Sequence, residues 1–536
     1  MSVRAFMDFL LLGSNYFKHA LQEMGHRAVW AGDDPACDLC LPAQKLDIPY
    51  IISRLSCSPE AVILTDDLGR RVFPSGLEKT SLLKVWYAVD GPLNFFWHKE
   101  YASLFDLVLV DQKDCAQKLS RLSAAKTCWL PVGIETELFQ GPAEEKIYDL
   151  AFVGAVNKNV RPKRRRIIKL LSERHSVRTA GGRQKEWVPP QAAARLYRQA
   201  RMVLNENLFD GVTTRMLEGM ASGTMLFTEA AANGLEDLFQ PGQDLAAFSP
   251  CDLLEQAEYY LNNEKERERI AARGREKVMT AHHIRHRTET LLNLTAHARP
   301  GTGLQEGGLF FGQQGKVLFL AAMRWPDQGS RNWIIRAETM LKRAKRLNQA
   351  DKDALFFLGL IQILRNNHTE ARINLEDAAS QGSFRARLTL GYLALNKRDR
   401  RRAGQSFRQA VRQAEGQASF ESDPFRNMSD NGDLSADQHH ALGQLLEARG
   451  HDLTPGFSRL NLHMSMWNAF EHYYRAVTLD PYHLPALTRL GDLLMKYNAN
   501  IEAYHFLARA TEIDSVSIDL AQKANLAARQ GYISVS

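Results

Sequence analysis

Short apolar runs alternate with amphipathic runs through the first 298 residues, and this alternation constrains the fold more than any other feature. The first apolar run, 5–13, is followed by the helix-like stretch 14–26 and then by the apolar run 27–32. Further apolar runs lie at 61–67, 82–90, 107–112 and 127–134. Strands that alternate with helices build parallel sheets from β-α-β units. We therefore predict an α/β fold for this part of the chain.

A second series of the same kind begins at 148–156 and continues through the apolar runs 201–206 and 224–230. The two series are joined near 141–146, a polar segment with Gly and Pro that is typical of a linker. We therefore predict two Rossmann-like domains, 1–140 and 141–298. Ligands of such sheets bind at the carboxyl ends of the strands, so the cleft between the domains is the predicted site.

The remainder of the chain is almost wholly helical and contains a repeat. Gly359 stands 12 residues before Ala371, and Ala378 follows seven residues later. Units that begin at Gly391 and Gly491 have the same two spacings, and a unit at Gly443 has 14 extra residues between its helices. Small residues at such positions let paired helices stack closely. The segment 315–536 resembles tetratricopeptide repeats, which implies a surface for a protein partner.

Composition narrows the class of protein. At 536 residues the chain suffices for about three domains of roughly 150 residues each. No apolar run approaches the roughly 18 residues of a membrane span, so we expect a cytoplasmic protein without a membrane segment. The net charge of +7 suits an anionic ligand such as a nucleotide diphosphate but does not by itself indicate nucleic-acid binding. The basic run 162–166 leaves a nucleic-acid or nuclear-localisation interpretation open, although a solvated helix face is the more frequent outcome.

Metal sites find little support in the sequence. Six cysteines are scattered along the chain, and the pair Cys37 and Cys40 is not followed by a second ligand pair. The acids Asp66 and Asp67 are adjacent but do not form a recognisable metal-binding motif. We therefore predict no metal site.

The stretch 209–223, FDGVTTRMLEGMASG, places Asp210 eight residues before Glu218. A carboxylate can accept hydrogen bonds from two adjacent hydroxyl groups, and charge-assisted bonds are the stronger kind. Together with the strand-like runs on either side, the stretch resembles the donor site of GT-B glycosyltransferases, in particular the CgeB-like branch of the family-1 group. That family has an acid, seven residues and a glutamate, and Asp210 stands where the commonest form has glutamate.

The resemblance implies roles for these residues. Glu218 would accept hydrogen bonds from the nucleotide ribose, and Asp210 would face the transferred sugar. Arg215 matches a basic residue common in that branch, the alternative being a solvated helix arginine. Residues 268–292 resemble the last helices of the family, one of which crosses back to the N-terminal domain. The other residues predicted to contact the donor, by a backbone amide, by close approach or by a basic side chain, are Gly154, Lys158, Arg161, Arg164, Arg165, Gly211, Thr213 and Thr214. Gly13 and Ser14 are predicted to approach the substrate phosphates or the acceptor.

The acceptor side is marked by the aromatic stretch 85–106, which follows an apolar run and contains Asp90 and His98. Asp90 is a candidate general base or acceptor ligand. His98 lies among aromatic residues, so a partly buried histidine with satisfied hydrogen bonds is at least as good an interpretation.

The sequence thus predicts a glycosyltransferase that moves a sugar from a nucleotide diphosphate to a hydroxyl group of a glycan or protein. The resemblance implies retention of configuration and no metal or cofactor, although Asp210 weakens the inference of retention. Two other classes stay open: an interaction scaffold whose transferase half has lost activity, and a basic nucleic-acid binder, which predicts steeply salt-dependent binding.

Overall fold

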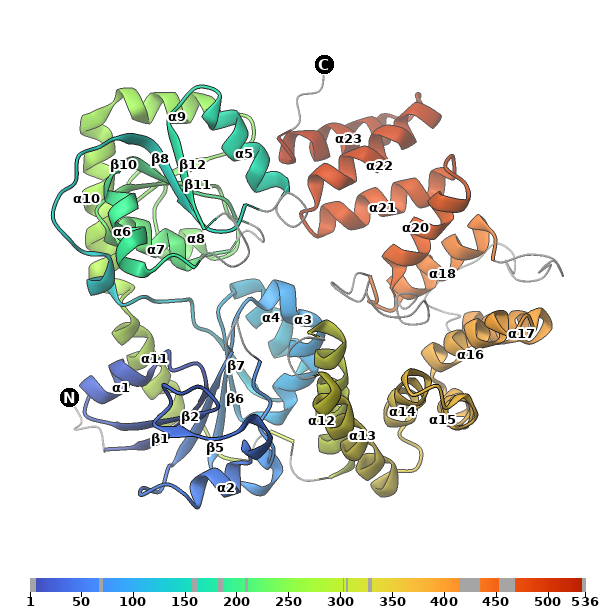
Figure 1. Ribbon diagram of the computed structural model, residues 1–536. Coiled ribbons are helices and arrows are strands. Elements are labelled where there is room, and N and C mark those ends of the chain that lie inside the picture. The colour runs from blue at the N-terminus through green and yellow to red at the C-terminus, as the bar shows by residue number, and fades with distance from the viewer. Residues whose placement is uncertain are drawn as a thin grey trace.

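The computed structural model describes residues 6–66, 71–156, 162–181, 187–207, 211–301, 303–304, 307–325, 330–413, 434–452 and 468–532. Two domains, each with a parallel sheet between helices, are followed by an all-helical region (Figure 1). This is the predicted fold class: two GT-B-type Rossmann-like domains and a helical C-terminal region.

The first sheet is entirely parallel in the order β3-β2-β1-β4-β5-β6-β7. Strand β1 lies between β2 and β4, so Leu10 is paired with both Val29 and Val62. The strand order reverses between β1 and β4, which leaves a crevice at their carboxyl ends. The strands of this sheet are β1 (Asp8–Gly13), β2 (Arg27–Gly32), β3 (Leu39–Cys40), β4 (Ala61–Thr65), β5 (Leu83–Ala88), β6 (Leu107–Val110) and β7 (Lys126–Trp129).

The second sheet is also parallel, in the order β12-β11-β10-β8-β9. Its order reverses between β8 and β10, and the carboxyl ends of these two strands lie near the donor stretch predicted from the sequence. The strands are β8 (Tyr148–Val153), β9 (Val177–Ala180), β10 (Ala200–Asn205), β11 (Met225–Glu229) and β12 (Ala246–Phe248).

Helices cover both sheets. The α-helices of the two domains are α1 (Lys18–Glu23), α2 (Ile48–Ile52), α3 (Gly91–Tyr101), α4 (Lys113–Leu122), α5 (Pro162–Ser172), α6 (Pro190–Arg198), α7 (Thr214–Ala221), α8 (Leu235–Leu238), α9 (Leu253–Asn262), α10 (Glu264–Ala281) and α11 (Ile284–Ala296). Short 3-10 helices are η1 (Ala43–Lys45), η2 (Leu77–Lys79), η3 (Ala102–Leu104) and η4 (Thr136–Phe139). The last helix, α11, returns to the first domain, where Ile284 and Leu291 are buried in one apolar cluster with Phe17.

The helical region begins with α12 at Gly308, ahead of residue 315, where the predicted repeat segment starts. Its helices are α12 (Gly308–Arg324), α13 (Ser330–Leu347), α14 (Lys352–Leu364), α15 (His368–Ser380), α16 (Phe384–Asn396), α17 (Arg400–Gln413), α18 (Ala436–Ala448), α20 (Ala469–Leu479), α21 (Leu484–Lys496), α22 (Asn500–Ile513) and α23 (Ile518–Gln530). Consecutive helices pack in pairs, α12 with α13, α14 with α15, α16 with α17, α18 with α20, and α21 with α22.

A glycine on the first helix of a pair faces a large side chain on the second. A Cβ added at Gly359 would lie 2.7 Å from the Leu375 side chain, and one at Gly391 would lie 2.5 Å from Phe407. Gly491 faces Leu507 at 2.3 Å in the same way. The recurring glycine of the sequence repeat therefore makes room for the partner helix.

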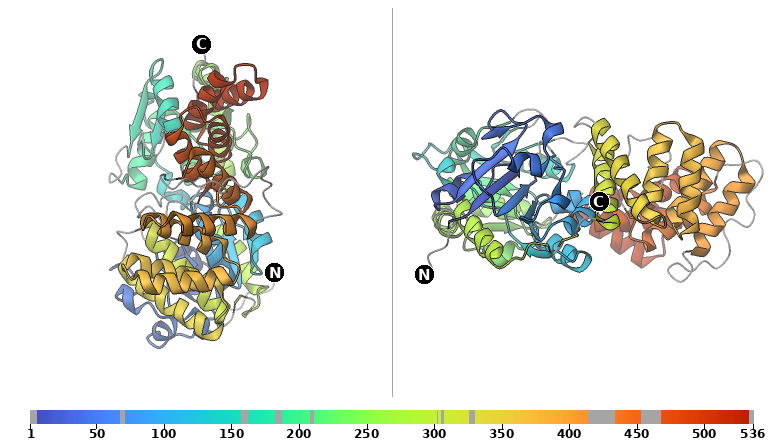
Figure 2. Two further views of the ribbon diagram at one scale, coloured as in Figure 1. Left: turned by 90° about the vertical axis from the view of Figure 1, so that its right-hand side faces the viewer. Right: turned by 90° about the horizontal axis from the view of Figure 1, so that it is seen from below.

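The helical region contacts both domains. Its first helix, α12, packs against α3 of the first domain. At its far end Tyr532 is buried in the core of the second domain, where Arg166 Nε donates to its carbonyl oxygen at 2.9 Å. Figures 1 and 2 show the helices running from one domain to the other. No helix in the described part of the chain is both long and apolar enough to cross a bilayer.

Candidate functional site

The two domains meet where strands of both sheets end. Gln112, two residues after β6, donates from Nε2 to the Val212 carbonyl oxygen at 3.2 Å. Asn233, which follows β11, bonds Asp114 through two contacts of 2.9 and 2.8 Å, and Lys113 Nζ lies 2.6 Å from Asp237. Loops at the carboxyl ends of the two sheets therefore form this edge of the cleft, which is where an open α/β sheet binds ligands.

Glu218 lies on α7, one turn after the helix begins, and its side chain is half-buried. Tyr197 donates its hydroxyl to Glu218 Oε2 at 3.3 Å. Burial raises the pKa of Glu218, while the charge of Arg215 and a hydrogen bond from Thr214 act to lower it. A carboxylate in this setting has poor access to water and retains oxygen lone pairs for further donors.

Arg215 is directed inward and not into solvent. Its Nε donates to the Val153 carbonyl oxygen at 2.6 Å, its Nη1 donates to Asn205 Oδ1 at 2.8 Å, and its guanidinium lies 4.3 Å from the centre of the Phe152 ring. Burial, and after it the charge of Arg164, lower the pKa of Arg215 to about 10. The solvated-arginine interpretation is therefore wrong, and Arg215 joins the ends of β8 and β10.

Helix α5 brings Arg164 to the same place. Its Nε lies 2.8 Å from Glu206 Oε2, and its Nη1 donates to the Ala155 carbonyl oxygen at 2.9 Å. Lys163, which was not among the predicted donor contacts, is also buried and bonds Glu229 at 2.9 Å. Arg165 is exposed, so the structure gathers Lys163 and Arg164 here and leaves Arg165 in solvent.

Gly154 follows β8 with φ of +148°. A Cβ at this position would lie 2.7 Å from Arg215 Nη2, so the absent side chain makes room for the arginine. Gly211 packs on Gln112, because its Cβ would lie 1.8 Å from Gln112 Oε1. Both glycines permit close approach, but what approaches them in this structure is a side chain.

Helix α7 begins at Thr214, which is exposed, after the N-cap Thr213. Thr213 does not cap the helix with its side chain; its hydroxyl donates to Asn205 Oδ1 at 3.2 Å. The first N–H groups of an α-helix have no acceptor within the helix and carry partial positive charge, which favours an anion.

In the first domain Gly13 ends β1 with φ of +77°, and a Cβ there would lie 2.1 Å from the Thr65 carbonyl oxygen. Ser14 is half-buried, and its N–H donates to the same oxygen at 3.1 Å. These two residues form a tight turn at the strand-order reversal of the first sheet.

Asp90 and Asp111 lie together at the carboxyl ends of β5 and β6. Asp90 adopts a left-handed conformation with φ of +55°, and its N–H donates to Asp111 Oδ2 at 2.9 Å. Burial and the neighbouring charge of Asp90 raise the pKa of Asp111 to about 7. Asp111 was not predicted as a site residue, although it directly follows a buried apolar run as Asp90 does.

His98 is fully buried and lies 3.1 Å from Asp66 Oδ2. Burial lowers the pKa of His98 despite this carboxylate. The ring is fully and not partly buried, and its charged neighbour is Asp66, but neither ring nitrogen makes a well-formed hydrogen bond to a described residue, so the structure does not show a satisfied histidine. The predicted residues Asp210, Lys158 and Arg161, as well as Asp67, fall outside the described residues. Within the described residues no group of three His, Cys, Asp or Glu side chains is arranged to hold a metal ion.

The two facing parallel sheets define a domain arrangement of the GT-B type. Within it, residues 161–293 match the model of a family described as "Glycosyl transferase-like". This match includes α5, α7 and the residues around Glu218. No protein with a curated description matches the chain.

The solved structures that match this backbone have low sequence identity to this chain. A sucrose-phosphate synthase from Thermosynechococcus elongatus is 14% identical, with a TM-score of 0.39, over 54% of this chain and 98% of that one. HepE from Anabaena, solved with UDP-glucose, is 10% identical, with a TM-score of 0.40, over 54% of this chain and 99% of that one. The pneumococcal O-GlcNAc transferase GtfA, solved with UDP and GlcNAc, is 11% identical, with a TM-score of 0.33. That match covers 44% of this chain and 57% of GtfA.

Proposed function

We propose that this protein is a glycosyltransferase that moves a sugar from a nucleotide diphosphate to a hydroxyl group of a glycan or protein. The observation that carries the proposal is the half-buried Glu218 beside the inward-directed Arg215, on the helix that follows β10 and inside the segment that matches the glycosyl transferase-like model. A carboxylate and a guanidinium held this way can bind the two ends of a nucleoside diphosphate: the carboxylate binds the hydroxyl groups and the guanidinium binds the phosphates.

Arg215 has the charge for the phosphate end. Among the described residues no carboxylate oxygen lies within 4 Å of its guanidinium, whereas Arg164 is paired with Glu206 at 2.8 Å. A cation that is fixed in place but not neutralised stabilises the charge that develops on a leaving diphosphate. The first N–H groups of α7 act in the same direction.

Asp90 is the proposed acceptor-side base. It is half-buried at the carboxyl end of β5, and the neighbouring Asp111 shares its surroundings. Because Asp111 is almost fully buried, it acts on Asp90 through charge and hydrogen bonding and not by contact with a substrate. The proposal includes transfer with retention, without a metal ion or cofactor, and catalysis by positioning and charge stabilisation.

The proposal assigns the helical region to binding of a protein partner, in the manner of tetratricopeptide repeats, and the protein to the cytoplasm. The domain boundaries 1–140, 141–298 and 315–536 belong to the same proposal. A scaffold without transferase activity is the competing function, favoured by the extent of the helical region from α12 to α23.

A panel of nucleotide diphosphate sugars, tested by thermal denaturation of the full chain, examines the proposal. A ligand that binds only the folded state increases the free energy of unfolding, by about 2.7 kcal/mol when its concentration is one hundred times its Kd. The melting temperature rises as a result. We expect one nucleotide base to stabilise the protein with saturation, and its free nucleoside diphosphate to compete. A scaffold would show no saturable stabilisation by any member of the panel.

A further inference from the structure

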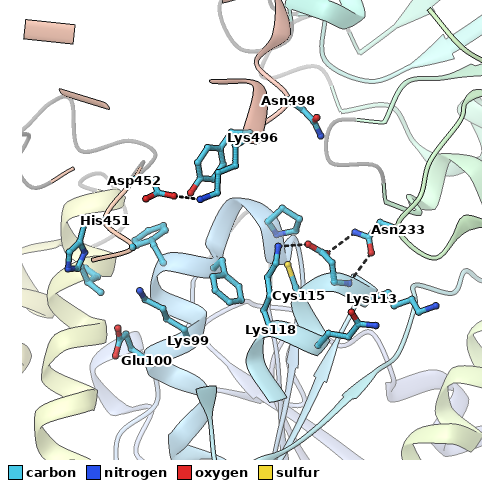
Figure 3. Close-up of a pocket in the computed structure, with 18 of the residues that line it drawn as sticks. Lys99, Glu100, Lys113, Cys115, Lys118, Asn233, His451, Asp452, Lys496 and Asn498 are labelled. Atoms are coloured by element: carbon cyan, nitrogen blue, oxygen red, sulfur yellow. Dashed lines mark hydrogen bonds and ion pairs between the residues drawn. The ribbon is translucent and has the colours of Figure 1, made fainter. Parts of the chain in front are cut away.

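A pocket of about 840 Å³ lies outside the candidate donor site, between the first domain and the helical region. One wall consists of residues from α3 and α4, the opposite wall of residues from the helical region, and the edge of residues 232–233 of the second domain (Figure 3). Three parts of the molecule therefore enclose a single pocket.

The helical wall comes from one side of the helical region. Lys316 and Leu320 lie on α12, Phe357 on α14 and Arg385 on α16, each the first helix of its pair. Lys496 ends α21, which is also the first helix of its pair. In stacked helix pairs the first helices form one continuous surface, and such surfaces bind extended chains.

The pocket contains one more positive charge than its acidic neighbours neutralise. Five of its six cations have a carboxylate partner: Lys118 with Asp114, Lys113 with Asp237, Lys316 with Glu100 and Asp353, Arg385 with Asp353, and Lys496 with Asp452. The sixth is Lys99, for which no carboxylate within 4 Å exists among the described residues.

Lys99 is directed into the pocket, opposite Asp452 and His451 (Figure 3). Burial lowers the pKa of Lys99, and burial together with the charges of Arg385 and Lys99 lowers the pKa of His451 to about 3. Burial is the largest cause of this shift, and the positive charges of Arg385 and Lys99 act in the same direction, as the excess positive charge at Lys99 leads us to expect. An anionic group placed beside Lys99 would remove this imbalance.

Apolar surface surrounds this charge. Phe95, Phe96, Phe357, Tyr497 and Pro92 line the pocket with the cations. Aromatic faces bind apolar side chains, so the ligand that fits best combines a carboxylate with apolar side chains. An extended polypeptide segment with acidic and aromatic residues has this combination.

The pocket also adjoins the cleft. Its wall on α4 begins at Lys113, the residue after Gln112, which bonds Val212 across the two domains. Asn233 belongs to the pocket and also bonds Asp114 between the domains. A chain that lies in the pocket therefore passes close to the edge of the cleft.

We infer that this pocket binds an acidic, aromatic-containing polypeptide segment, with a carboxylate of that segment on the Lys99 ammonium. If the proposed function holds, this segment belongs to an acceptor protein, and that part of the inference rests on the proposed function. The binding of the segment in the pocket does not rest on it. Residues next to the bound segment in the same polypeptide would then lie near the cleft between the two domains.

The test is fluorescence anisotropy with the full-length protein and three labelled peptides of alternating composition, Glu with Phe, Gln with Phe, and Lys with Phe. We expect saturable binding of the Glu peptide, much weaker binding of the Gln peptide and none of the Lys peptide. Lys99→Met should weaken binding of the Glu peptide about tenfold or more, since a hydrogen bond to a charged group contributes roughly 1.5–3 kcal/mol.

Lys277→Met, which alters an exposed lysine of α10 outside the pocket, is the matched control and should bind the Glu peptide as the wild type does. Equal binding of the Glu and Gln peptides, or equal weakening in both variants, would overturn the inference, because either result means that Lys99 does not select the ligand. Peptide binding is measured without nucleotide, so it can succeed when no nucleotide sugar binds, and it can fail while the donor still stabilises the protein.

Discussion

At the scale of single residues, Asp111, Glu218 and Glu229 hold carboxyl groups where burial disfavours their charge. Burial raises the pKa of all three. Glu218 and Glu229 each have a cation nearby that opposes the shift, Arg215 and Lys163 respectively. Asp111 has instead the like charge of Asp90 beside it. The pKa of Asp111 is raised to about 7, so its protonation changes near neutral pH.

We predict that Asp111→Asn alters the pH dependence of stability. The pKa of Asp111 rises from 3.8 to about 7 on folding, so the folded state binds the proton more tightly than the unfolded state. The contribution of this proton to stability is present at low pH and is lost as pH rises from about 4 to about 7. Denaturant unfolding at several pH values measures the free energy of unfolding. Over this range that of the wild type should fall by on the order of 2–4 kcal/mol relative to that of Asp111→Asn. Asp519→Asn, on an exposed acid, is the control and should leave the pH dependence unchanged. A constant difference between Asp111→Asn and the wild type at every pH would contradict this account.

At the scale of helices and strands, much of the architecture follows from local pattern. The apolar runs predict β1, β2, β4 to β8, β10 and β11, and these strands are present, because strands buried on both faces need near-continuous apolar sequence. The two-residue strand β3 and the three-residue strand β12 were not predicted, since neither is long enough to show a pattern. The spacing of small residues in the repeat predicted paired helices, and the structure adds that the glycines face large side chains.

The details of the site depend on contacts that no local pattern records. Whether Arg164 or Arg165 points inward is set by how α5 rotates onto the sheet, and the basic run alone contains no such information. The bond from Tyr532 to Glu229 joins residues 303 positions apart. The places of Glu218 and Asp90, by contrast, could be predicted, Asp90 from the apolar run before it and Glu218 from the resemblance of the stretch 209–223; their roles stay predictions.

We predict that Gly391→Ala destabilises the helical region. Replacing a helical glycine ordinarily stabilises a helix by about 1 kcal/mol. Here the added Cβ would lie 2.5 Å from the Phe407 ring, and overpacking costs about 1–3 kcal/mol, so the net change is a loss. Chemical denaturation measures it. The double variant Gly391→Ala with Phe407→Leu makes room for the methyl group and should recover part of the stability. A single variant more stable than the wild type would show that α16 and α17 are not packed this tightly.

At the scale of the whole molecule, the helical region bridges the two domains. It starts on α3 of the first domain and ends with Tyr532 in the core of the second. The Tyr532 hydroxyl donates to Glu229 Oε1 at 3.1 Å, and the same carboxylate bonds Lys163 at 2.9 Å. The end of the chain is thereby coupled to the basic residues beside the candidate donor site, and the bridge restrains separation of the domains.

We predict that Tyr532→Phe loosens this coupling. Losing a hydrogen bond to a charged group costs about 1.5–3 kcal/mol, and here the loss falls on the contact between Tyr532, just after α23, and Glu229 at the end of β11, which also bonds Lys163 at the start of α5. Hydrogen exchange should become faster in α23 and at the start of α5 while the first domain keeps its protection. Tyr482→Phe, on a tyrosine with 72% of its surface exposed, is the control and should leave both helices as protected as in the wild type. Unchanged exchange in the Tyr532 variant would mean that the hydroxyl contributes nothing to docking.

The measurement that tests the central claim most directly is the slow release of nucleoside diphosphate from the stabilising nucleotide sugar, followed in the absence of acceptor. In the wild type the rate of release should saturate with the concentration of the nucleotide sugar. Glu218→Ala should lose both the release and the tight binding of the nucleotide, while a cooperative thermal transition shows that the variant is still folded. Ala is the informative change, since Glu218 has Tyr197 as its hydrogen-bond partner and a shortened side chain cannot reach a second donor. If Glu218→Ala releases nucleotide at the rate of the wild type, Glu218 does not hold the donor and the assignment of this cleft as a transferase site is wrong.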